Sequence, residues 1–303
     1  MLKAVLLQLA KSRRFARFVT GNSFARRCAR RFIAGDMLHE AVAVVRELNS
    51  EGISATIDFL GEHVTSADGA QRVSYVCLDL VEAIANEKLD ANVSVKLSQL
   101  GLDVDPKLCE GLLKNIVTRA ELRNSFVRVD MEGSAYAEQT INIVERVREH
   151  SHAVGPVIQA YLYRSELNVV KLLHSRCPMR LCKGAYKEPS RIAYQRKKEV
   201  DANFVHLMQI LLKSGIYHGI ATHDKKIIDQ CIEFSQMWCI SKKEFEFQML
   251  YGIRRDLQKD LVRRGYKVRV YVPFGNQWFP YFMRRLAERP ANLWFFLRSA
   301  LRA

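Results

Sequence analysis

Eight short runs of apolar or β-branched residues alternate with longer segments of helical periodicity along most of this chain. The runs cover residues 53–60, 93–97, 126–131, 157–161, 179–183, 219–222, 244–250 and 268–272. Apolar residues recur at helical spacing in the segments 73–84, 141–147 and 202–212. Eight strands that are each followed by a helix, over about 250 residues, are typical of a (β/α)8 barrel, the TIM barrel.

A doubly wound open sheet also alternates strands with helices, but it normally begins with a glycine-rich turn after the first strand. Here the first run ends in Phe59-Leu60-Gly61-Glu62, and the pattern G-x-G-x-x-G does not occur in the sequence. We therefore predict an α/β chain made of one barrel over residues 36–303, preceded by a basic amphipathic helical extension over residues 1–35.

The formal net charge of +15 is concentrated in that extension, where residues 1–31 contain nine Lys or Arg and no Asp or Glu. Apolar residues recur at helical spacing among these charges, at Leu2, Val5, Leu6, Leu9, Phe15, Phe18 and Val19. A basic amphipathic helix can lie on an anionic membrane surface, or it can pack on the domain with its charges solvated. Both interpretations stay open. Nucleic-acid binding is not expected, because no aromatic-studded basic motif accompanies the pI of 9.6.

The sequence indicates a cytoplasmic protein. No apolar run approaches the roughly 20 residues that span a bilayer, and the apolar stretch 4–10 lacks a secretory cleavage site. Seven scattered cysteines without a C-x-x-C pair suit packed thiols in a reducing compartment. Binding of residues 1–31 to lipid would add peripheral attachment to the inner face of the cell membrane. We expect no metal site, because His150 and His152 have no third ligand at metal spacing.

Polar side chains gather where the predicted strands end, and in a barrel these carboxyl ends carry the active site. They are Lys96, Asp130, Gln159, Tyr161, Arg180, Lys183, Thr222, His223, Asp224 and Tyr271. A buried Lys or Arg is costly unless it is paired, so acids of neighbouring strands are the structural explanation. The set holds more cationic than anionic groups, which suggests that anionic ligands bind there.

Four polar residues of segment 279–289 share one face of a predicted helix, at spacings i, i+3, i+4 and i+7: Tyr281, Arg284, Arg285 and Glu288. Two adjacent arginines can bind a carboxylate through planar, charge-assisted hydrogen bonds. Spacing alone favours a surface helix in which Arg284 and Glu288 form a solvent-screened ion pair.

Seven stretches, in order, resemble the signature of the proline dehydrogenase family. They are residues 95–98 (VKLS), 159–161 (QAY), 180–189 (RLCKGAYKEP), 221–224 (ATHD), 246–252 (EFQMLYG), 271–275 (YVPFG) and 281–292 (YFMRRLAERPAN). Each stretch alone is a weak signal, but their common order over residues 36 to 300 is specific. The resemblance implies a distorted (β/α)8 barrel that holds FAD, with a final helix over the barrel mouth. It also implies hydride transfer from C5 of L-proline to flavin N5, giving Δ1-pyrroline-5-carboxylate, with electrons passed to a membrane quinone.

The resemblance also assigns roles to residues of this chain. Lys96, Arg284 and Arg285 match the groups that bind the substrate carboxylate. The rest of the substrate pocket matches Asp130, Tyr186, Leu250, Tyr271 and Tyr281, with Glu288 as a nearby polar partner. Flavin-contacting positions match Gln159, Arg180, Cys182, Lys183, Gly184, Ala185, Thr222 and His223. A positive charge at Arg180 would favour the electron-rich reduced flavin.

Some positions depart from the common pattern of the family. Lys187 stands where the large bifunctional members carry Trp, and Asp224 where they carry Asn; both resemble the small monofunctional bacterial branch. Cys182 replaces a common Val. Two other classes of protein stay open: a Schiff-base aldolase barrel that uses Lys96 or Lys183, and a non-catalytic basic protein that binds membrane or RNA through residues 1–31.

Overall fold

The computed structural model describes residue 12, residues 19–61 and residues 64–288. The apolar positions of the basic extension before Val19, and residues 289–292 of the last family stretch, lie outside this part of the chain.

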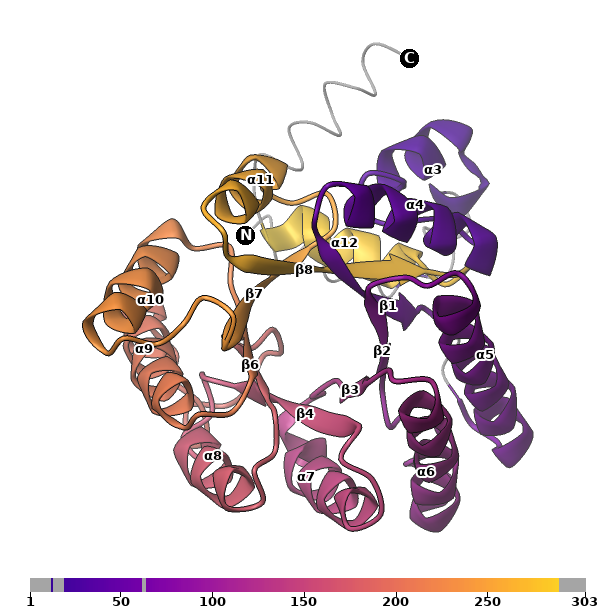
Figure 1. The fold of residues 1–303 in the computed structure, drawn as a ribbon. Coiled ribbons are helices and arrows are strands. Elements are labelled where there is room, and N and C mark those ends of the chain that lie inside the picture. The colour runs from indigo at the N-terminus through magenta and orange to yellow at the C-terminus, as the bar shows by residue number, and fades with distance from the viewer. Residues whose placement is uncertain (1–11, 13–18, 62–63, 289–303) are drawn as a thin grey trace.

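A closed barrel of eight parallel strands forms the centre of the molecule (Figure 1), so the predicted fold class is confirmed. Every neighbouring pair is parallel, and β1 pairs with both β2 and β8, which closes the sheet. The strands are β1 (Ser54–Phe59), β2 (Ala91–Val95), β3 (Val127–Val129), β4 (Val154–Gln159), β5 (Arg180–Cys182), β6 (His218–Ala221), β7 (Phe245–Leu250) and β8 (Lys267–Phe274).

Each strand is followed by a helix, and the helices that follow β1 to β7 surround the barrel (Figure 1). The described helices are α3 (Ser23–Ala29), α4 (Leu38–Ser50), α5 (Ala67–Asn86), α6 (Pro106–Leu122), α7 (Ser134–Arg148), α8 (Ser165–His174), α9 (Lys197–Lys213), α10 (Lys225–Met237), α11 (Arg255–Arg263) and α12 (Phe279–Glu288). The helix α4 contacts both β1 and β8, so it covers the part of the outer wall that an eighth helix would otherwise cover.

Local sequence explains where the outer helices begin. The side chain of Asp105 accepts a hydrogen bond of 2.8 Å from the Lys107 amide, and Pro106 occupies the first turn of α6. Both features favour a helix start, because the first amides of a helix have no backbone acceptor. In α5 one face is buried against the barrel, at Ala70, Val73, Cys77, Leu80, Val81 and Ile84. The predicted helical segments 73–84, 141–147 and 202–212 lie within α5, α7 and α9.

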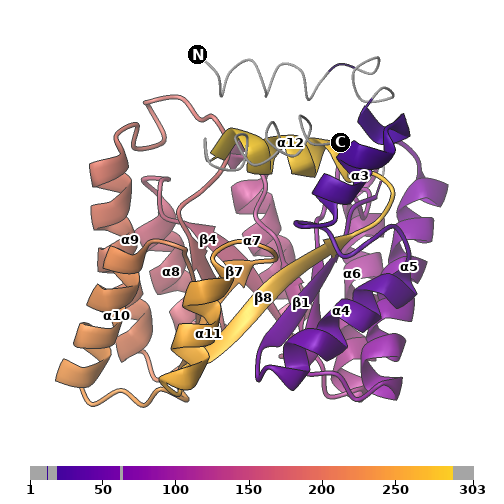
Figure 2. The ribbon, with the colours of Figure 1, turned by 90° about the horizontal axis from the view of Figure 1, so that it is seen from above.

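The last helix of the described residues, α12, lies across one end of the barrel (Figure 2), as the family resemblance predicts. It packs against Leu60 and Ile253, which follow the carboxyl ends of β1 and β7, so this end is the mouth of the barrel. The helix α12 follows β8 in the chain. Because it covers the mouth, it does not join the ring of helices around the barrel.

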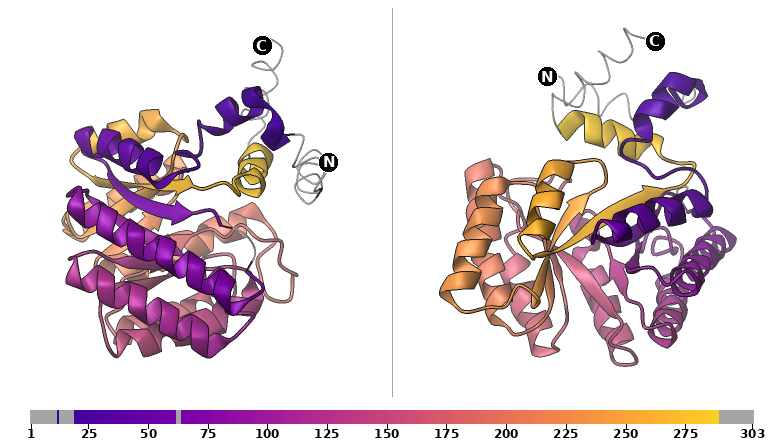
Figure 3. Two further views of the ribbon diagram at one scale, coloured as in Figure 1. Left: turned by 90° about the vertical axis from the view of Figure 1, so that its right-hand side faces the viewer. Right: turned by 45° about the horizontal axis from the view of Figure 1, so that its top comes forward.

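The helix α3 and the turn after it pack against α12, and the two views of Figure 3 agree on this position. Ring contacts join Phe32 to Phe282 at 6.2 Å and Trp278 to Phe282 at 5.9 Å between centroids. The described part of the extension therefore packs on the domain, whereas its boundary at residue 35 stays a prediction. None of the described helices is long and apolar enough to cross a membrane.

Candidate active site

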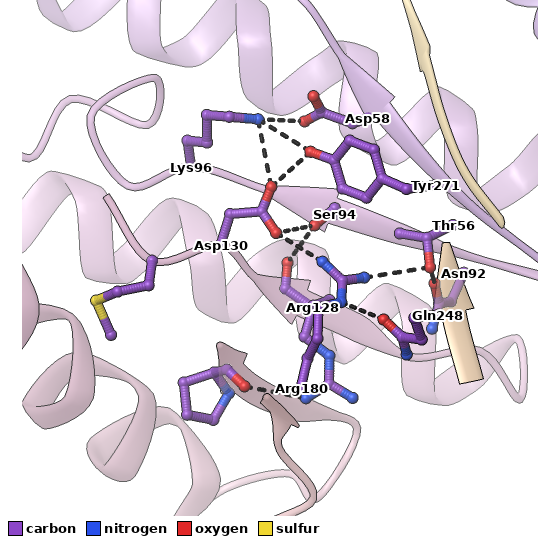
Figure 4. Close-up of polar contacts among 12 residues, drawn as sticks. Thr56, Asp58, Asn92, Ser94, Lys96, Arg128, Asp130, Arg180, Gln248 and Tyr271 are labelled. Carbon is purple, nitrogen blue, oxygen red and sulfur yellow. Dashed lines mark hydrogen bonds and ion pairs between the residues drawn. The ribbon is translucent and has the colours of Figure 1, made fainter. Parts of the chain in front are cut away.

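A polar network lies inside the barrel near the carboxyl ends of its strands (Figure 4). Asp58 belongs to β1, Arg180 to β5 and Tyr271 to β8, while Lys96 and Asp130 directly follow β2 and β3. Five strands thus place one charged or phenolic side chain each in the same region, which is where a (β/α)8 barrel carries its chemistry.

Lys96 is held by three oxygen atoms. Its Nζ lies 2.6 Å from Asp58 Oδ1, 3.3 Å from the Tyr271 hydroxyl and 3.4 Å from Asp130 Oδ2. The side chain of Lys96 is 21% exposed, whereas that of Asp58 is 2% exposed. The ammonium group is therefore fixed from the barrel interior and still reachable from the mouth.

Asp130 lies at the centre of the network. Its Oδ2 accepts a hydrogen bond of 2.6 Å from the Tyr271 hydroxyl, and its Oδ1 accepts hydrogen bonds of 2.7 Å from Ser94 and 2.9 Å from Arg180 Nη1. The guanidinium carbon of Arg180 is 5.3 Å from the centroid of the Tyr271 ring. These contacts fix one carboxylate, one phenol and one guanidinium relative to each other.

Arg180 is also held from the other side. Its Nε donates to Gln248 Oε1, and its Nη2 lies 3.4 Å from Thr56 Oγ1. Gln248 in turn donates through Nε2 to Glu246, which pairs with Arg269 at 2.8 Å. The guanidinium of Arg180 is buried, at 6% exposure, and these side-chain contacts from two sides hold it in one orientation.

The electrostatics of the network favour a cationic lysine beside a neutral phenol. Burial raises the pKa of Asp58, and the charge of Asp130 acts in the same direction against the attraction of Lys96. Burial opposes charge on Lys96, but attraction from Asp58 and Asp130 outweighs it, so the pKa of Lys96 is raised. For Asp130 burial is outweighed by Lys96 and Arg180, and its pKa is lowered. Burial raises the pKa of Tyr271 well above its ordinary value.

Lys183 lies at the end of β5 and is paired with two acids. Its Nζ is 2.5 Å from Asp201 of α9 and 3.0 Å from Asp224. The expected surplus of cations at the strand ends is therefore wrong, because Asp58 and Asp201 were not counted. These acids balance Lys96 and Lys183, so the charge count no longer indicates a missing anionic ligand.

Gln159 has a feature that a bound ligand would explain, whereas Gly184 is required by the chain itself. Gln159 is 3% exposed, and its Nε2 donates to the Met131 carbonyl at 3.3 Å. Its Oε1 is buried and has no hydrogen-bond partner among the described residues. Gly184 has φ of +105°, and a Cβ there would lie 2.3 Å from the ring of Tyr161, so only glycine fits.

The other predicted flavin positions lie in or directly after β5 and β6. Burial raises the pKa of the Cys182 thiol to about 11, so the thiol is neutral near pH 7. Ala185 is exposed and Thr222 is buried. His223 accepts a hydrogen bond of 2.9 Å through Nε2 from the amide of Leu250, the last residue of β7. The His223 ring therefore fixes the end of that strand.

The helix α12 brings Tyr281, Arg284 and Arg285 to the mouth. Tyr281 and Arg285 are buried at 6% and 8% exposure, while Arg284 is exposed. The guanidinium carbons lie 6.0 Å (Arg284) and 5.0 Å (Arg285) from the centroid of the Tyr281 ring. The surface-helix interpretation is therefore wrong for Arg285, because its side chain is buried and not solvated. The side chain of Glu288 lies outside the described part.

Tyr186 lies in the loop after β5 and is half-exposed. Partial burial raises the pKa of its hydroxyl; Glu132 also raises it, whereas Lys96 and Arg284 lower it. The phenol of Tyr186 thus senses charges of both the interior network and α12.

Sequence reasoning missed several residues that hold the network together, among them Thr56, Asp58, Asp201 and Gln248. A signal existed for Asp58, which is the single charged residue in the apolar run 53–60. The carboxyl group of Asp201 comes from α9, and nothing in the spacing of that helix indicates that it meets Lys183. Among the described residues, no group of three or more His, Cys, Asp or Glu could hold a metal ion.

The closed parallel barrel and the charged cluster at its mouth place the chain in the class of (β/α)8-barrel enzymes. Sequence comparison then identifies the family: the family described as proline dehydrogenase matches residues 41–298. The chain is 41% identical over 302 residues to proline dehydrogenase 1 of Bacillus subtilis subsp. natto, with 100% of both chains covered. It is 39% identical over 282 residues to proline dehydrogenase of Deinococcus radiodurans, with 90% of each covered.

Among solved structures, the chain is similar to proline utilization A from Bdellovibrio bacteriovorus, inactivated by N-propargylglycine. The TM-score is 0.82 at 25% identity, with 93% of this chain and 38% of that longer chain covered. The chain belongs to the proline dehydrogenase family. It is an oxidoreductase of proline metabolism, and the expected monofunctional type agrees with the matched length of its relatives.

Proposed function

We propose that this enzyme oxidises L-proline to Δ1-pyrroline-5-carboxylate with FAD as its cofactor and a membrane quinone as the final electron acceptor. The observation that supports this most directly is the fixed group of Lys96, Asp130, Arg180 and Tyr271 at the barrel mouth, which the helix α12 covers (Figure 2). When bound, FAD supplies flavin N5, the acceptor of the hydride from C5 of proline.

The substrate carboxylate is assigned to Lys96, Arg284 and Arg285. Lys96 keeps its charge because its pKa is raised, and the two guanidiniums offer planar paired donors. Binding at these three groups orients the pyrrolidine ring before the reaction, which lowers the entropic part of the barrier. The remaining wall of the substrate pocket is assigned to Asp130, Tyr186, Leu250, Tyr271, Tyr281 and Glu288.

The flavin is assigned to the residues around β4, β5 and β6. The unpartnered Oε1 of Gln159 fits a flavin, because the isoalloxazine ring carries an N–H donor and a buried acceptor needs such a partner. Arg180, oriented by Gln248 and Asp130, supplies positive charge that favours the electron-rich reduced ring. Cys182, Lys183, Gly184, Ala185, Thr222 and His223 are the further flavin positions.

Access to quinone calls for contact with a membrane, and α3 offers a basic surface for it. Arg26, Arg27, Arg30 and Arg31 are exposed on the side of α3 and its following turn that faces away from the buried Ala25, Cys28 and Ala29. Anionic headgroups attract such a cluster. This supports a cytoplasmic enzyme that attaches to the inner face of the cell membrane.

A Schiff-base aldolase is disfavoured by the same network. Its nucleophile is an unprotonated lysine, whereas the pKa of Lys96 is raised and Lys183 is paired with two carboxylates.

The experiment that tests the proposal is a steady-state assay of the purified protein supplied with FAD. L-Proline should drive reduction of a soluble dye, and denaturation should release FAD from the protein. A protein that stays colourless after reconstitution with FAD, and reduces no dye with L-proline, would contradict the proposed function.

A further inference from the structure

Asp58 is a buried carboxylate at the base of the network and has no role in the assignments above. It lies in β1 at 1% exposure, and β1 pairs with β2 and β8. Lys96 directly follows β2 and Tyr271 lies in β8, so Asp58 stands between the strands that present both groups to the mouth. Its Oδ1 makes the shortest contact of Lys96 Nζ, at 2.6 Å.

The second carboxylate near Lys96 serves several partners at once. Asp130 accepts hydrogen bonds from Ser94, Arg180 and Tyr271, and it lies farther from Lys96 Nζ, at 3.4 Å. A carboxylate shared in this way can hold the lysine less firmly than one that contacts it directly.

We propose that Asp58 is a positioning residue, which holds the ammonium group of Lys96 in place at the barrel mouth and keeps it charged for the carboxylate of the substrate. The inference rests on the proposed function, which assigns Lys96 to that carboxylate. Burial alone would drive Lys96 toward its neutral form, and a neutral amine cannot form a charge-assisted hydrogen bond with the substrate.

The groups that face this ion pair come from all surrounding elements. Asp130 at the end of β3 acts on the charge of both Asp58 and Lys96. Tyr271 of β8 acts on Asp58, and its hydroxyl accepts a hydrogen bond from Lys96. Tyr186, in the loop after β5, also acts on Lys96. The thiol of Cys77 in α5 also interacts with Asp58, but burial raises the pKa of this thiol to about 12, so it stays neutral. Asp58 and Asp130 are thus the anions that stabilise the charge on Lys96.

Removal of the Asp58 charge has two opposite effects on a bound carboxylate. Near neutral pH, Asp58→Asn removes a nearby negative charge, which by itself would strengthen binding of an anion. At alkaline pH, Lys96 loses its proton more easily, which weakens binding. The proposal therefore predicts that the affinity of the variant for a carboxylate falls as the pH rises into the alkaline range. It does not predict an equal loss of affinity at every pH.

The first measurement reads Lys96 directly. Competitive acetylation of the FAD-loaded protein, followed by mass spectrometry, gives the pKa of Lys96 from its reactivity against pH. Asp58→Asn should lower that pKa, so that Lys96 reacts at a lower pH than in the unaltered protein. Glu82→Gln is the control, because Glu82 is likewise a carboxylate paired with cations, Arg119 and Arg123, but lies on α5 outside the network of Lys96. It should leave the Lys96 reactivity profile unchanged.

The second measurement reads carboxylate binding. Cyclopentanecarboxylate has the ring and carboxylate of proline without its titrating amine, so its inhibition constant against L-proline reports the carboxylate site alone. In Asp58→Asn, binding of this inhibitor should weaken roughly tenfold between pH 7 and 10, as expected for the loss of a charge-assisted hydrogen bond. In a Lys96→Met background, the Asp58→Asn change should add no pH dependence. If Asp58→Asn does not fold, Asp58→Ser gives the same test.

The two measurements separate the inference from the proposed function. An unchanged Lys96 reactivity profile in Asp58→Asn, with impaired carboxylate binding in Lys96→Met, would overturn the role of Asp58 and leave the proposed function standing. Normal carboxylate binding in Lys96→Met would overturn the assignment of Lys96, and the role of Asp58 with it.

Discussion

The hydroxyl of Tyr271 donates a hydrogen bond of 2.6 Å to Oδ2 of Asp130, across the interior from β8 to the end of β3. This bond fixes the Tyr271 ring beside Lys96, whose Nζ is 3.3 Å from the same hydroxyl. A large, fixed ring therefore borders the region where the proposed substrate ring binds.

The position of Tyr271 predicts discrimination against substituted prolines. A 4-hydroxyl on the substrate would project toward Tyr271, so kcat/KM for trans-4-hydroxyproline should be lower than for proline by about tenfold or more. Tyr271→Ser should narrow this gap because it removes the ring, whereas Tyr271→Phe should keep most of it because the ring stays. Comparable kcat/KM values for both substrates in the unaltered enzyme would refute the prediction.

Arg284→Met and Arg285→Met should each remove a charge-assisted hydrogen bond to the substrate carboxylate, worth roughly 1.5–3 kcal/mol. The expected loss in kcat/KM is about tenfold to more than a hundredfold. Arg→Lys should not fully restore activity at either position, since an ammonium cannot make the planar two-point contact.

The matched control is Arg255→Met. Arg255 is also an exposed arginine beside a tyrosine ring, with its guanidinium carbon 5.2 Å from the Tyr251 centroid, but it lies on α11. It should change kcat/KM by less than about threefold. Near-normal proline kinetics in both α12 variants would exclude the arginine pair as the carboxylate site.

The fold was predictable because its signals are local, and the site was only partly predictable because its contacts are not. Strand runs and turn residues placed all eight strands, although Lys96, Asp130 and Lys183 follow their strands and do not lie within them. The partners of those residues come from other elements: Asp58 from β1 and Asp201 from α9. Likewise, helical spacing grouped Arg284 with Arg285, but the structure buries only Arg285.

His218 predicts how stability changes with pH. It is fully buried in β6, where Nδ1 accepts the Met179 amide at 3.0 Å. Burial, assisted by Arg128, lowers the pKa of His218 to about 3. The unfolded chain therefore binds a proton near pH 6.5 that the folded chain excludes, so His218 lowers stability as pH falls below about 6.5, by up to roughly 1.4 kcal/mol per pH unit.

Urea unfolding between pH 7 and 5 measures this effect. His218→Asn keeps a hydrogen-bond acceptor without the titration, so its free energy of unfolding should be lower at pH 7 but fall less steeply with acid. His150→Asn, at an exposed histidine, should keep the slope of the unaltered protein. Equal slopes for all three proteins would contradict the prediction.

The basic surface of α3 predicts binding to anionic vesicles at low salt. Arg26→Gln with Arg27→Gln should weaken binding by about 2 kcal/mol, roughly thirtyfold, since each basic residue near an anionic surface contributes about 1 kcal/mol. The same double change at the exposed Arg263 and Arg264, at the end of α11, should have little effect on vesicle binding. Equal loss in both variants, or no binding by the unaltered protein, would leave α3 without a membrane role.

Anaerobic titration of the FAD-loaded protein with L-proline tests the central claim most directly. Reduction removes the visible absorption band of the oxidised flavin, so L-proline should bleach the protein in the absence of any other electron acceptor. D-Proline is the matched control, because it presents the same ring and carboxylate with the opposite handedness. Bleaching by L-proline and not by D-proline is the predicted result. A flavin band that stays unchanged at saturating L-proline would contradict the account.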